Sequence, residues 1–320
     1  MSAEVPAGDK IEVGQFHSSI AVHSGKPSLQ IALDNTSLSV YKECPRKYYY
    51  KIVCGYRAPG IRPPLAWGGA YHSVVELYDL LIVKGEDEQT ALRAAIRLAF
   101  SLAEKGFGDD TARTLTTLVR TIVWYAANYR ARDPLKTHIF GNGKVGLELS
   151  FRFYLPQTIS GTNDKYVYCG HIDKISDYAG GTYAVERKHS KGALNDEFYA
   201  RYAFSAQIGG YATAGKICFA TELSGVIIDG AQVLVNSSRF GRRVVHRVNS
   251  HLEEWLDDTL LWVKLLEGSA VANYWQHNTE SCNKFSGCEF REVCSKPPGI
   301  REAILRQAYV VERWNPIEDR

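Results

Sequence analysis

The sequence has little net charge and no long apolar run. Its 38 basic and 35 acidic side chains leave a formal charge of +3, which is too small by itself to demand a nucleic acid as partner. No Gly-x-x-x-x-Gly-Lys-Ser/Thr motif is present, so the chain has no such helicase signature. None of its apolar runs could span a bilayer, and its polar beginning is unlike a signal peptide. We therefore expect a cytoplasmic protein.

A disulfide framework is also not expected. Seven cysteines are an odd number, and no secretion signal accompanies them, so metal or cluster ligation is the alternative. The composition is otherwise ordinary for a globular protein, with 45% hydrophobic and 23% charged residues. A chain of 320 residues can bury the core of one large domain, with or without an added helical part.

The most informative stretch covers residues 168–188. Two runs rich in Ile, Val and Tyr flank Gly180–Gly181, which predicts a β-hairpin whose tight turn uses the positive φ angles open to glycine. Glu186 and Lys188 are two residues apart, so they point to the same face of a strand. Asp173 lies on the adjoining strand. We expect these three charged side chains to converge.

This convergence would suit a metal ion. Two carboxylates and an ammonium group on one face can form an oxygen-rich site for Mg²⁺ or Mn²⁺ with a lysine beside it. A metal there neutralises charge developing on a phosphate and lowers the pKa of a bound water, while the lysine orients the nucleophile or stabilises the transition state. The alternative is a solvated strand face with an ion pair between Glu186 and Lys188, and these residues alone leave both open.

The order Asp173, hairpin, Glu186-Arg187-Lys188 resembles the signature of the PD-(D/E)XK nuclease superfamily. The resemblance implies an α/β fold of the restriction-endonuclease type, with a mixed central sheet flanked by helices. It also implies that Asp173, Glu186 and the backbone carbonyl of Arg187 bind the metal. Lys188 would position or activate the attacking water. The implied enzyme is a Mg²⁺- or Mn²⁺-dependent deoxyribonuclease.

Two helical patterns resemble the RecB-like branch of this superfamily. Gly68-x-x-x-His72-x-x-x-Glu76 is similar to the helix that supplies a metal-binding histidine, with His72 as a third ligand and Glu76 as a weaker candidate beside it. A structural histidine is the alternative. Gln207 and Tyr211 share one face of a later expected helix and resemble the Gln-x-x-x-Tyr element that contacts DNA.

Two further regions surround this expected site. The alternation of apolar and polar residues over 145–154 predicts a half-buried strand. Glu148 lies on it, and the family often carries a glutamate there, although a solvent-facing side chain is equally open. Residues 87–132 have helical spacing and predict two amphipathic helices joined near residues 106–108. In the family such an insertion covers the active-site face.

A basic patch is expected on the pair of strands predicted over residues 225–249. It contains Arg239, Arg242 and Arg243, which could bind DNA phosphates. A solvated hairpin tip is the alternative.

Three cysteines recur six residues apart: Cys282, Cys288 and Cys294. This spacing lacks the two close pairs of structural zinc sites and suits a [4Fe–4S] cluster, with Cys44 as the expected fourth ligand. One cysteine before the core and three after it resemble the iron–sulfur nucleases of the AddB and CRISPR-adaptation type. We expect such a cluster to be structural, because it would close a very long loop.

These patterns predict an N-terminal arm over 1–30, a nuclease core over 31–276, and a cysteine-cluster region with a C-terminal tail over 277–320. The resemblance implies a DNA exonuclease that acts on single strands or ends in recombination, repair or phage replication, in the host cytoplasm if it is phage-encoded. Two alternatives stay open. One is an end-trimming nuclease that is active only with a recombination or CRISPR-adaptation partner protein, and the other is a DNA-binding subunit with a vestigial metal site.

Overall fold

The chain divides into two compact units. The computed structural model describes residues 20–23, 26–129, 133–284 and 287–318, so most of the predicted N-terminal arm lies outside the described residues. The central unit is formed by residues 60–150 and 171–249. The terminal unit is formed by the described residues up to 59, by 151–170 and by the described residues from 250 to 318. The domain boundaries drawn from the sequence stay a prediction.

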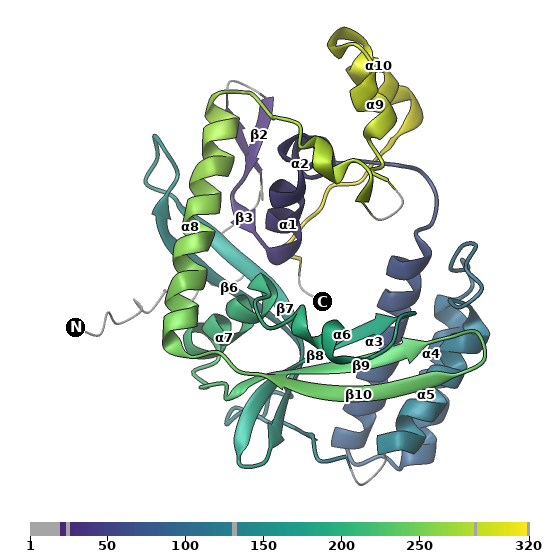
Figure 1. Cartoon of the computed structure of the whole chain (residues 1–320). Helices are drawn as coiled ribbons and strands as arrows, with labels where there is room; N and C mark the ends of the chain where they lie inside the picture. Colours follow the sequence, from purple (N-terminus) through teal and green to yellow (C-terminus); the bar gives the residue numbers. More distant parts are fainter. Residues whose placement is uncertain (1–19, 24–25, 130–132, 285–286, 319–320) are drawn as a thin grey trace. The chain divides into compact units, whose positions relative to one another are not determined.

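A mixed β-sheet forms one layer of the central unit (Figure 1). Its strands follow the order β10-β9-β8-β7, and β5 and β6 also pair with β7. Strand β9 runs parallel to β8, whereas β10 pairs with β9, and β7 with β8, in antiparallel fashion. The strands are β5 (Lys136–Thr137), β6 (Leu147–Thr158), β7 (Lys165–Tyr178), β8 (Gly181–Ser190), β9 (Gly225–Val233) and β10 (Ser238–Val245). Strands β6 and β7 continue into the terminal unit.

Helices flank the sheet of the central unit on both faces, and the predicted α/β class is confirmed. Helix α3 begins with a proline, which suits the first helical turn, and the carboxylate of Asp87 caps α4 by accepting hydrogen bonds from the next backbone N–H groups. Gly106 and Gly108 adopt positive φ in the connection that follows α4. The helices are α3 (Pro63–Val83), α4 (Glu88–Leu102), α5 (Leu115–Tyr129), α6 (Asp196–Ala200) and α7 (Ala206–Cys218). The end of the predicted insertion, residues 130–132, lies outside the described residues.

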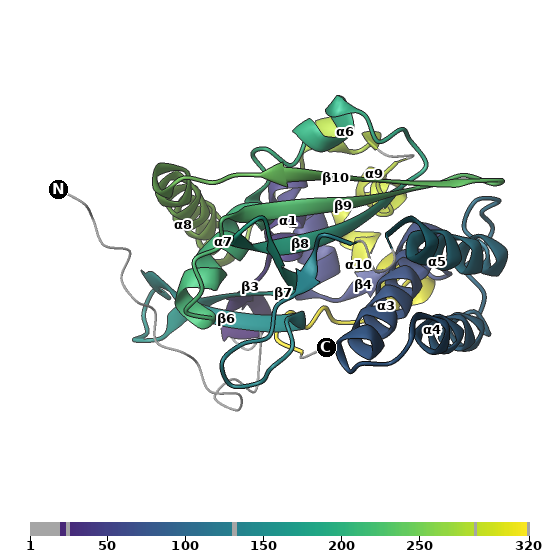
Figure 2. The same ribbon diagram turned by 90° about the horizontal axis from the view of Figure 1, so that it is seen from below.

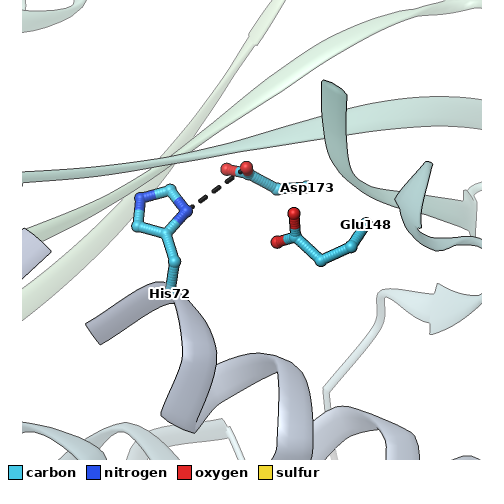
Figure 3. A group of neighbouring side chains, drawn as sticks. All are labelled: His72, Glu148 and Asp173. Carbon is cyan, nitrogen blue, oxygen red and sulfur yellow. Dashed lines mark ion pairs between the residues drawn. The ribbon is translucent and has the colours of Figure 1, made fainter. Parts of the chain in front are cut away.

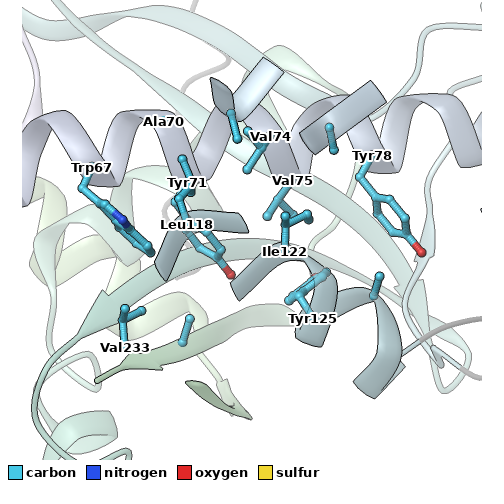
Figure 4. Close-up of a cluster of buried hydrophobic side chains, with 14 of the residues drawn as sticks. Trp67, Ala70, Tyr71, Val74, Val75, Tyr78, Leu118, Ile122, Tyr125 and Val233 are labelled. Carbon is cyan, nitrogen blue, oxygen red and sulfur yellow. The ribbon is translucent and has the colours of Figure 1, made fainter. Parts of the chain in front are cut away.

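The core of the central unit lies between α3, α4, α5 and strand β9 (Figure 4). Figure 2 shows these three helices packed side by side. Ala91, Ala95 and Ala99 recur every fourth residue along α4 and are fully buried, so their small side chains let α4 approach its neighbours closely. Trp67 and Tyr71 stack at 5.5 Å on the buried side of α3. This packing fixes α3, which carries His72.

The predicted hairpin is formed by β7 and β8, with Tyr178 paired to Gly181. Its two-residue turn has positive φ at Ala179 and Gly180, at +48° and +82°. The positive φ angles were expected at both glycines, but Gly181 is already a paired strand residue. A side chain at Gly181 would meet the Ser224 hydroxyl oxygen at 2.5 Å, so close approach of the backbone is what requires this second glycine.

The terminal unit is mainly helical. Its strand β3 pairs in parallel with the first half of β7, where Ala32 lies opposite Val167. Among the described residues, no helix is both long and apolar enough to cross a membrane. The elements are β1 (Ile20–His23), β2 (Lys26–Gln30), β3 (Ala32–Leu33), α1 (Asn35–Glu43), α2 (Pro45–Tyr48), η1 (Tyr49–Val53), β4 (Tyr56–Arg57), α8 (Asn249–Val271), η3 (Thr279–Ser281), α9 (Arg291–Ser295), α10 (Pro298–Ala308) and β11 (Val310–Val311).

Candidate metal-dependent active site

Three side chains of the central unit converge from different elements: His72 on α3, Glu148 on β6 and Asp173 on β7. Each offers one ligand atom, and these atoms lie within 4.8 Å of one another (Figure 3). The Nδ1 atom of His72 is 3.2 Å from Oδ1 of Asp173. One imidazole nitrogen and two carboxylates form a donor set that suits Mn²⁺ or Mg²⁺.

For Glu148, the sequence left a site residue and a solvent-facing side chain equally open. Its φ angle is +42°, in the left-handed region that residues other than glycine rarely adopt. Burial, followed by the nearby charges of Asp173 and Glu76, raises the pKa of Glu148 to about 7. Its buried Oε1 has no hydrogen-bond partner among the described residues. An unpaired buried carboxylate oxygen is what a bound cation would satisfy, so the residues present fit a divalent metal.

Asp173 is held as an anion. Its Oδ2 accepts a hydrogen bond of 2.7 Å from the backbone N–H of Arg187. Burial alone would raise its pKa, but His72 and then Arg187 outweigh burial and lower the pKa of Asp173 to about 2. In return, and against the effect of burial, Asp173 raises the pKa of His72.

Glu186 and Lys188 form an ion pair beside this group, on the same face of β8 as expected. Helix α7 closes a ring around the pair. The Tyr211 hydroxyl donates to Oε2 of Glu186 at 2.6 Å, and Gln207 Nε2 donates to the Tyr211 oxygen at 2.7 Å. The ammonium group of Lys188 donates in turn to Oε1 of Gln207 at 3.2 Å. Because Gln207 and Tyr211 are four residues apart, one helical face reaches both catalytic candidates.

The protonation of the Glu186–Lys188 pair depends on burial and mutual attraction. Burial and the neighbouring Asp173 raise the pKa of Glu186, although Lys188 opposes this. Burial lowers the pKa of Lys188, but Glu186 outweighs burial and the pKa is raised overall. Lys188 is therefore positively charged at neutral pH, and the ring offers a fixed cation next to the carboxylates.

Arg187 lies on the opposite face of β8 and is almost fully buried. Its Nη2 is 2.5 Å from Oδ2 of Asp79, which Lys174 also contacts at 2.9 Å. Sequence reasoning missed this buried charge cluster. Asp79 stands seven residues after His72, two turns along α3, and this spacing was the available signal. The cluster holds the strand residue whose N–H orients Asp173.

Comparison with known proteins decides the family. Residues 35–295 match the profile of the PD-(D/E)XK nuclease superfamily. The chain belongs to this superfamily. PD-(D/E)XK nucleases hydrolyse phosphodiester bonds with divalent metals, and the ligand atoms of His72, Glu148 and Asp173 lie close enough together to hold one. The search of curated proteins found no match.

Solved structures offer weaker likenesses. A crystal structure described as a "Putative exonuclease" from Eubacterium rectale is 14% identical, with a TM-score of 0.47, and covers 85% of this chain and 92% of its own. The structure of SSO0001 is 11% identical, with a TM-score of 0.37, and covers 83% of this chain and 87% of its own. With TM-scores this low, neither likeness indicates an activity for this chain.

The three predicted DNA-binding arginines of this PD-(D/E)XK protein differ in their surroundings. Arg242 is held by Asp133, at 2.6 and 3.1 Å, and its Nε lies 3.1 Å from Asp229. Its guanidinium group also lies over the Tyr129 ring at 3.6 Å. Arg242 therefore ties β10 to its neighbours inside the unit. Arg243 forms an exposed ion pair, and Arg239 is exposed, so both can be reached from solvent.

The four cysteines predicted to bind a cluster all lie in the terminal unit. The Sγ of Cys44 accepts a hydrogen bond from the backbone N–H of Asn278 at 3.4 Å, and the N–H of Cys288 donates to the carbonyl of Cys282 at 2.8 Å. Burial, then the neighbouring thiols, raises the pKa of Cys294 to about 11. In the part of the chain that the structure describes, no three of these thiols form a group that could hold a metal ion. This arrangement does not support the predicted cluster.

Proposed function

We propose that this protein is a Mg²⁺- or Mn²⁺-dependent deoxyribonuclease. The observation that carries the proposal is the convergence of His72, Glu148 and Asp173, with one buried and unpaired carboxylate oxygen, beside the Glu186–Lys188 pair. A bound divalent ion supplies a Lewis acid that neutralises phosphate charge and lowers the pKa of a coordinated water. The protein's own contribution is to hold these groups rigidly before substrate arrives.

Each residue of the site has its own role in this proposal. His72, Glu148 and Asp173 would hold the ion, with Glu186 and the backbone carbonyl of Arg187 as further ligands. Lys188 would hold the attacking water in line and keep a positive charge near the phosphate. Gln207 and Tyr211 fix the orientation of Glu186 and Lys188 through their ring of hydrogen bonds. In this proposal Gln207 and Tyr211 would also contact the DNA strand. Arg239 and Arg243 would attract the phosphate backbone.

We further propose a RecB-like exonuclease that acts on single strands or ends in the cytoplasm. The resemblance of the Gly68-x-x-x-His72 and Gln207-x-x-x-Tyr211 patterns supports this choice. The experiment is cleavage of end-labelled single- and double-stranded DNA, and of the same strands as closed circles, with Mn²⁺ or Mg²⁺. We expect cutting of linear but not circular DNA, and its loss in Lys188→Ala. Cutting that Lys188→Ala retains would refute the assigned roles, whereas cutting that needs an added partner protein would favour the complex-bound alternative.

A [4Fe–4S] cluster on Cys44, Cys282, Cys288 and Cys294 also stays a proposal. Its support is the even spacing of Cys282, Cys288 and Cys294 and the placement of all four thiols in one unit, although the described residues bring no three of these thiols together as a metal site. The test is iron and sulfide content, with the visible absorption spectrum, of anaerobically purified wild type and Cys44→Ser, with Cys54→Ser as control. Iron-free wild type, or equal iron in both variants, would refute the cluster.

A further inference from the structure

The turn between α6 and α7 carries a strongly exposed aromatic ring near the active site. Phe204 is 82% exposed, and it stands three residues before Gln207, the partner of Lys188. Three residues of chain span at most about 10 Å, so the Cα atoms of Phe204 and Gln207 lie within that distance of each other. Tyr202, in the same turn, interacts electrostatically with Lys188 and Glu186.

Two arginines accompany this ring. The guanidinium group of Arg247 lies 5.6 Å from the centre of the Phe204 ring and also donates a hydrogen bond to the Ser205 carbonyl. Arg201, on the other side of Tyr202 in sequence, is exposed and lies 4.9 Å from the Phe198 ring. An exposed aromatic ring with a cation against it is a combination that binds single-stranded nucleic acids, because a base stacks on the ring and the backbone phosphates meet the cation.

A single exposed apolar side chain is ordinary in folded proteins. Phe204 differs because three observations coincide: its high exposure, the Arg247 guanidinium group beside its ring, and its position three residues before Gln207, which accepts a hydrogen bond from Lys188. Its ring buries little surface in the fold, so folding does not explain why an aromatic stands there.

We propose that Phe204 is a stacking platform for an unpaired base of the strand that enters the active site, with Arg201 and Arg247 facing its phosphates. This inference rests on the proposed nuclease function and narrows the substrate to nucleic acid with unpaired nucleotides. A base inside a duplex is stacked on both faces and cannot use the platform.

The test is binding measured without cleavage, by fluorescence anisotropy in EDTA. The probes are a labelled single strand, an abasic strand of the same length, and a blunt duplex. We expect Phe204→Ala to weaken binding of the single strand about 5- to 150-fold. The abasic strand should bind Phe204→Ala and wild type equally, because it has no base to stack. Phe100→Ala, which removes another exposed ring, on α4, is the matched control and should bind like wild type.

Each result separates the platform from the nuclease function. Undiminished binding of the single strand by Phe204→Ala, with a wild type that cuts DNA, would overturn the platform and leave the nuclease standing. Equal losses for the abasic and the base-containing strand would also overturn it, because stacking needs a base. A wild type that neither binds these probes nor cuts DNA with Mn²⁺ would overturn the proposed function itself.

Discussion

Removing the charge of Glu148 should stabilise the metal-free protein and weaken its metal binding. Burial and the neighbouring acids raise the pKa of Glu148 from 4.5 to about 7. One pKa unit corresponds to about 1.4 kcal/mol, so the ionised side chain costs the folded protein about 3 kcal/mol above pH 7. Because the folded-state pKa is above the unfolded-state value, the cost is absent below pH 4.5 and grows as the pH rises to 7.

The variant Glu148→Gln keeps the shape of the side chain without its charge. We expect its free energy of unfolding in EDTA to exceed that of wild type by up to about 3 kcal/mol above pH 7, and the two to converge near pH 4.5. Mn²⁺ at a hundred times its dissociation constant should stabilise wild type by about 2.7 kcal/mol and the variant far less.

The assay is urea unfolding followed by tryptophan fluorescence at several pH values, with EDTA or Mn²⁺. Glu104→Gln, at an exposed position, is the control and should behave like wild type. A Glu148→Gln protein that is less stable than wild type in EDTA above pH 7 would refute the buried charge. Equal stabilisation of both proteins by Mn²⁺ would refute its role as a ligand.

Three other substitutions test the surroundings of the site. In Gly68→Ala the new Cβ would meet the His189 ring at 2.5 Å, so we expect the free energy of unfolding to fall by about 1–3 kcal/mol and Mn²⁺ binding to weaken as α3 shifts. Gly69→Ala, whose new Cβ would have nothing within 4 Å, should raise the free energy of unfolding by about 1 kcal/mol. Equal urea midpoints for the two variants would contradict this. Burial, then nearby cations, lowers the pKa of His189 to about 4. The free energy of unfolding of wild type should therefore fall by up to about 3 kcal/mol as the pH falls from 6.5 to 4. His189→Phe keeps an aromatic ring without the titrating group and should not show this loss. Tyr211→Phe removes a hydrogen bond to the charged Glu186, so the cleavage rate should fall about tenfold or more. The pH profile of cleavage should also shift to higher pH, because Glu186 becomes easier to protonate. An unchanged pH profile would argue against the role given to the ring of hydrogen bonds.

Local sequence patterns were enough to predict the scaffold. Glycines between two β-rich runs predicted the hairpin, and apolar residues at helical spacing predicted α4 and α5. The same-face placement of Glu186 and Lys188 followed from strand geometry alone, and the structure pairs them. Asp173 and the Glu186-x-Lys188 pattern, on the two strands of that hairpin, gave the resemblance to the superfamily, which the family match over residues 35–295 confirms.

Features that depend on contacts distant in sequence could not be predicted. The positive φ and unpaired oxygen of Glu148 arise only when β6 meets α3 and β7, so its pattern as a strand residue allowed a solvent-facing side chain equally well. Arg242 looked like part of a basic patch because Asp133, its partner, lies 109 residues away. The even spacing of the cysteines suggested a cluster, but spacing does not fix where the sulfur atoms lie.

Metal binding at Asp173 is the property on which the proposed active site depends most. The measurement is isothermal titration of Mn²⁺ into wild type, Asp173→Asn and Asp177→Asn, the last being an exposed aspartate on the same strand that serves as control. We expect wild type and Asp177→Asn to bind Mn²⁺ alike and to cut DNA, and Asp173→Asn to lose both while its circular dichroism spectrum stays native. Undiminished Mn²⁺ binding by a folded Asp173→Asn would contradict the proposed metal centre.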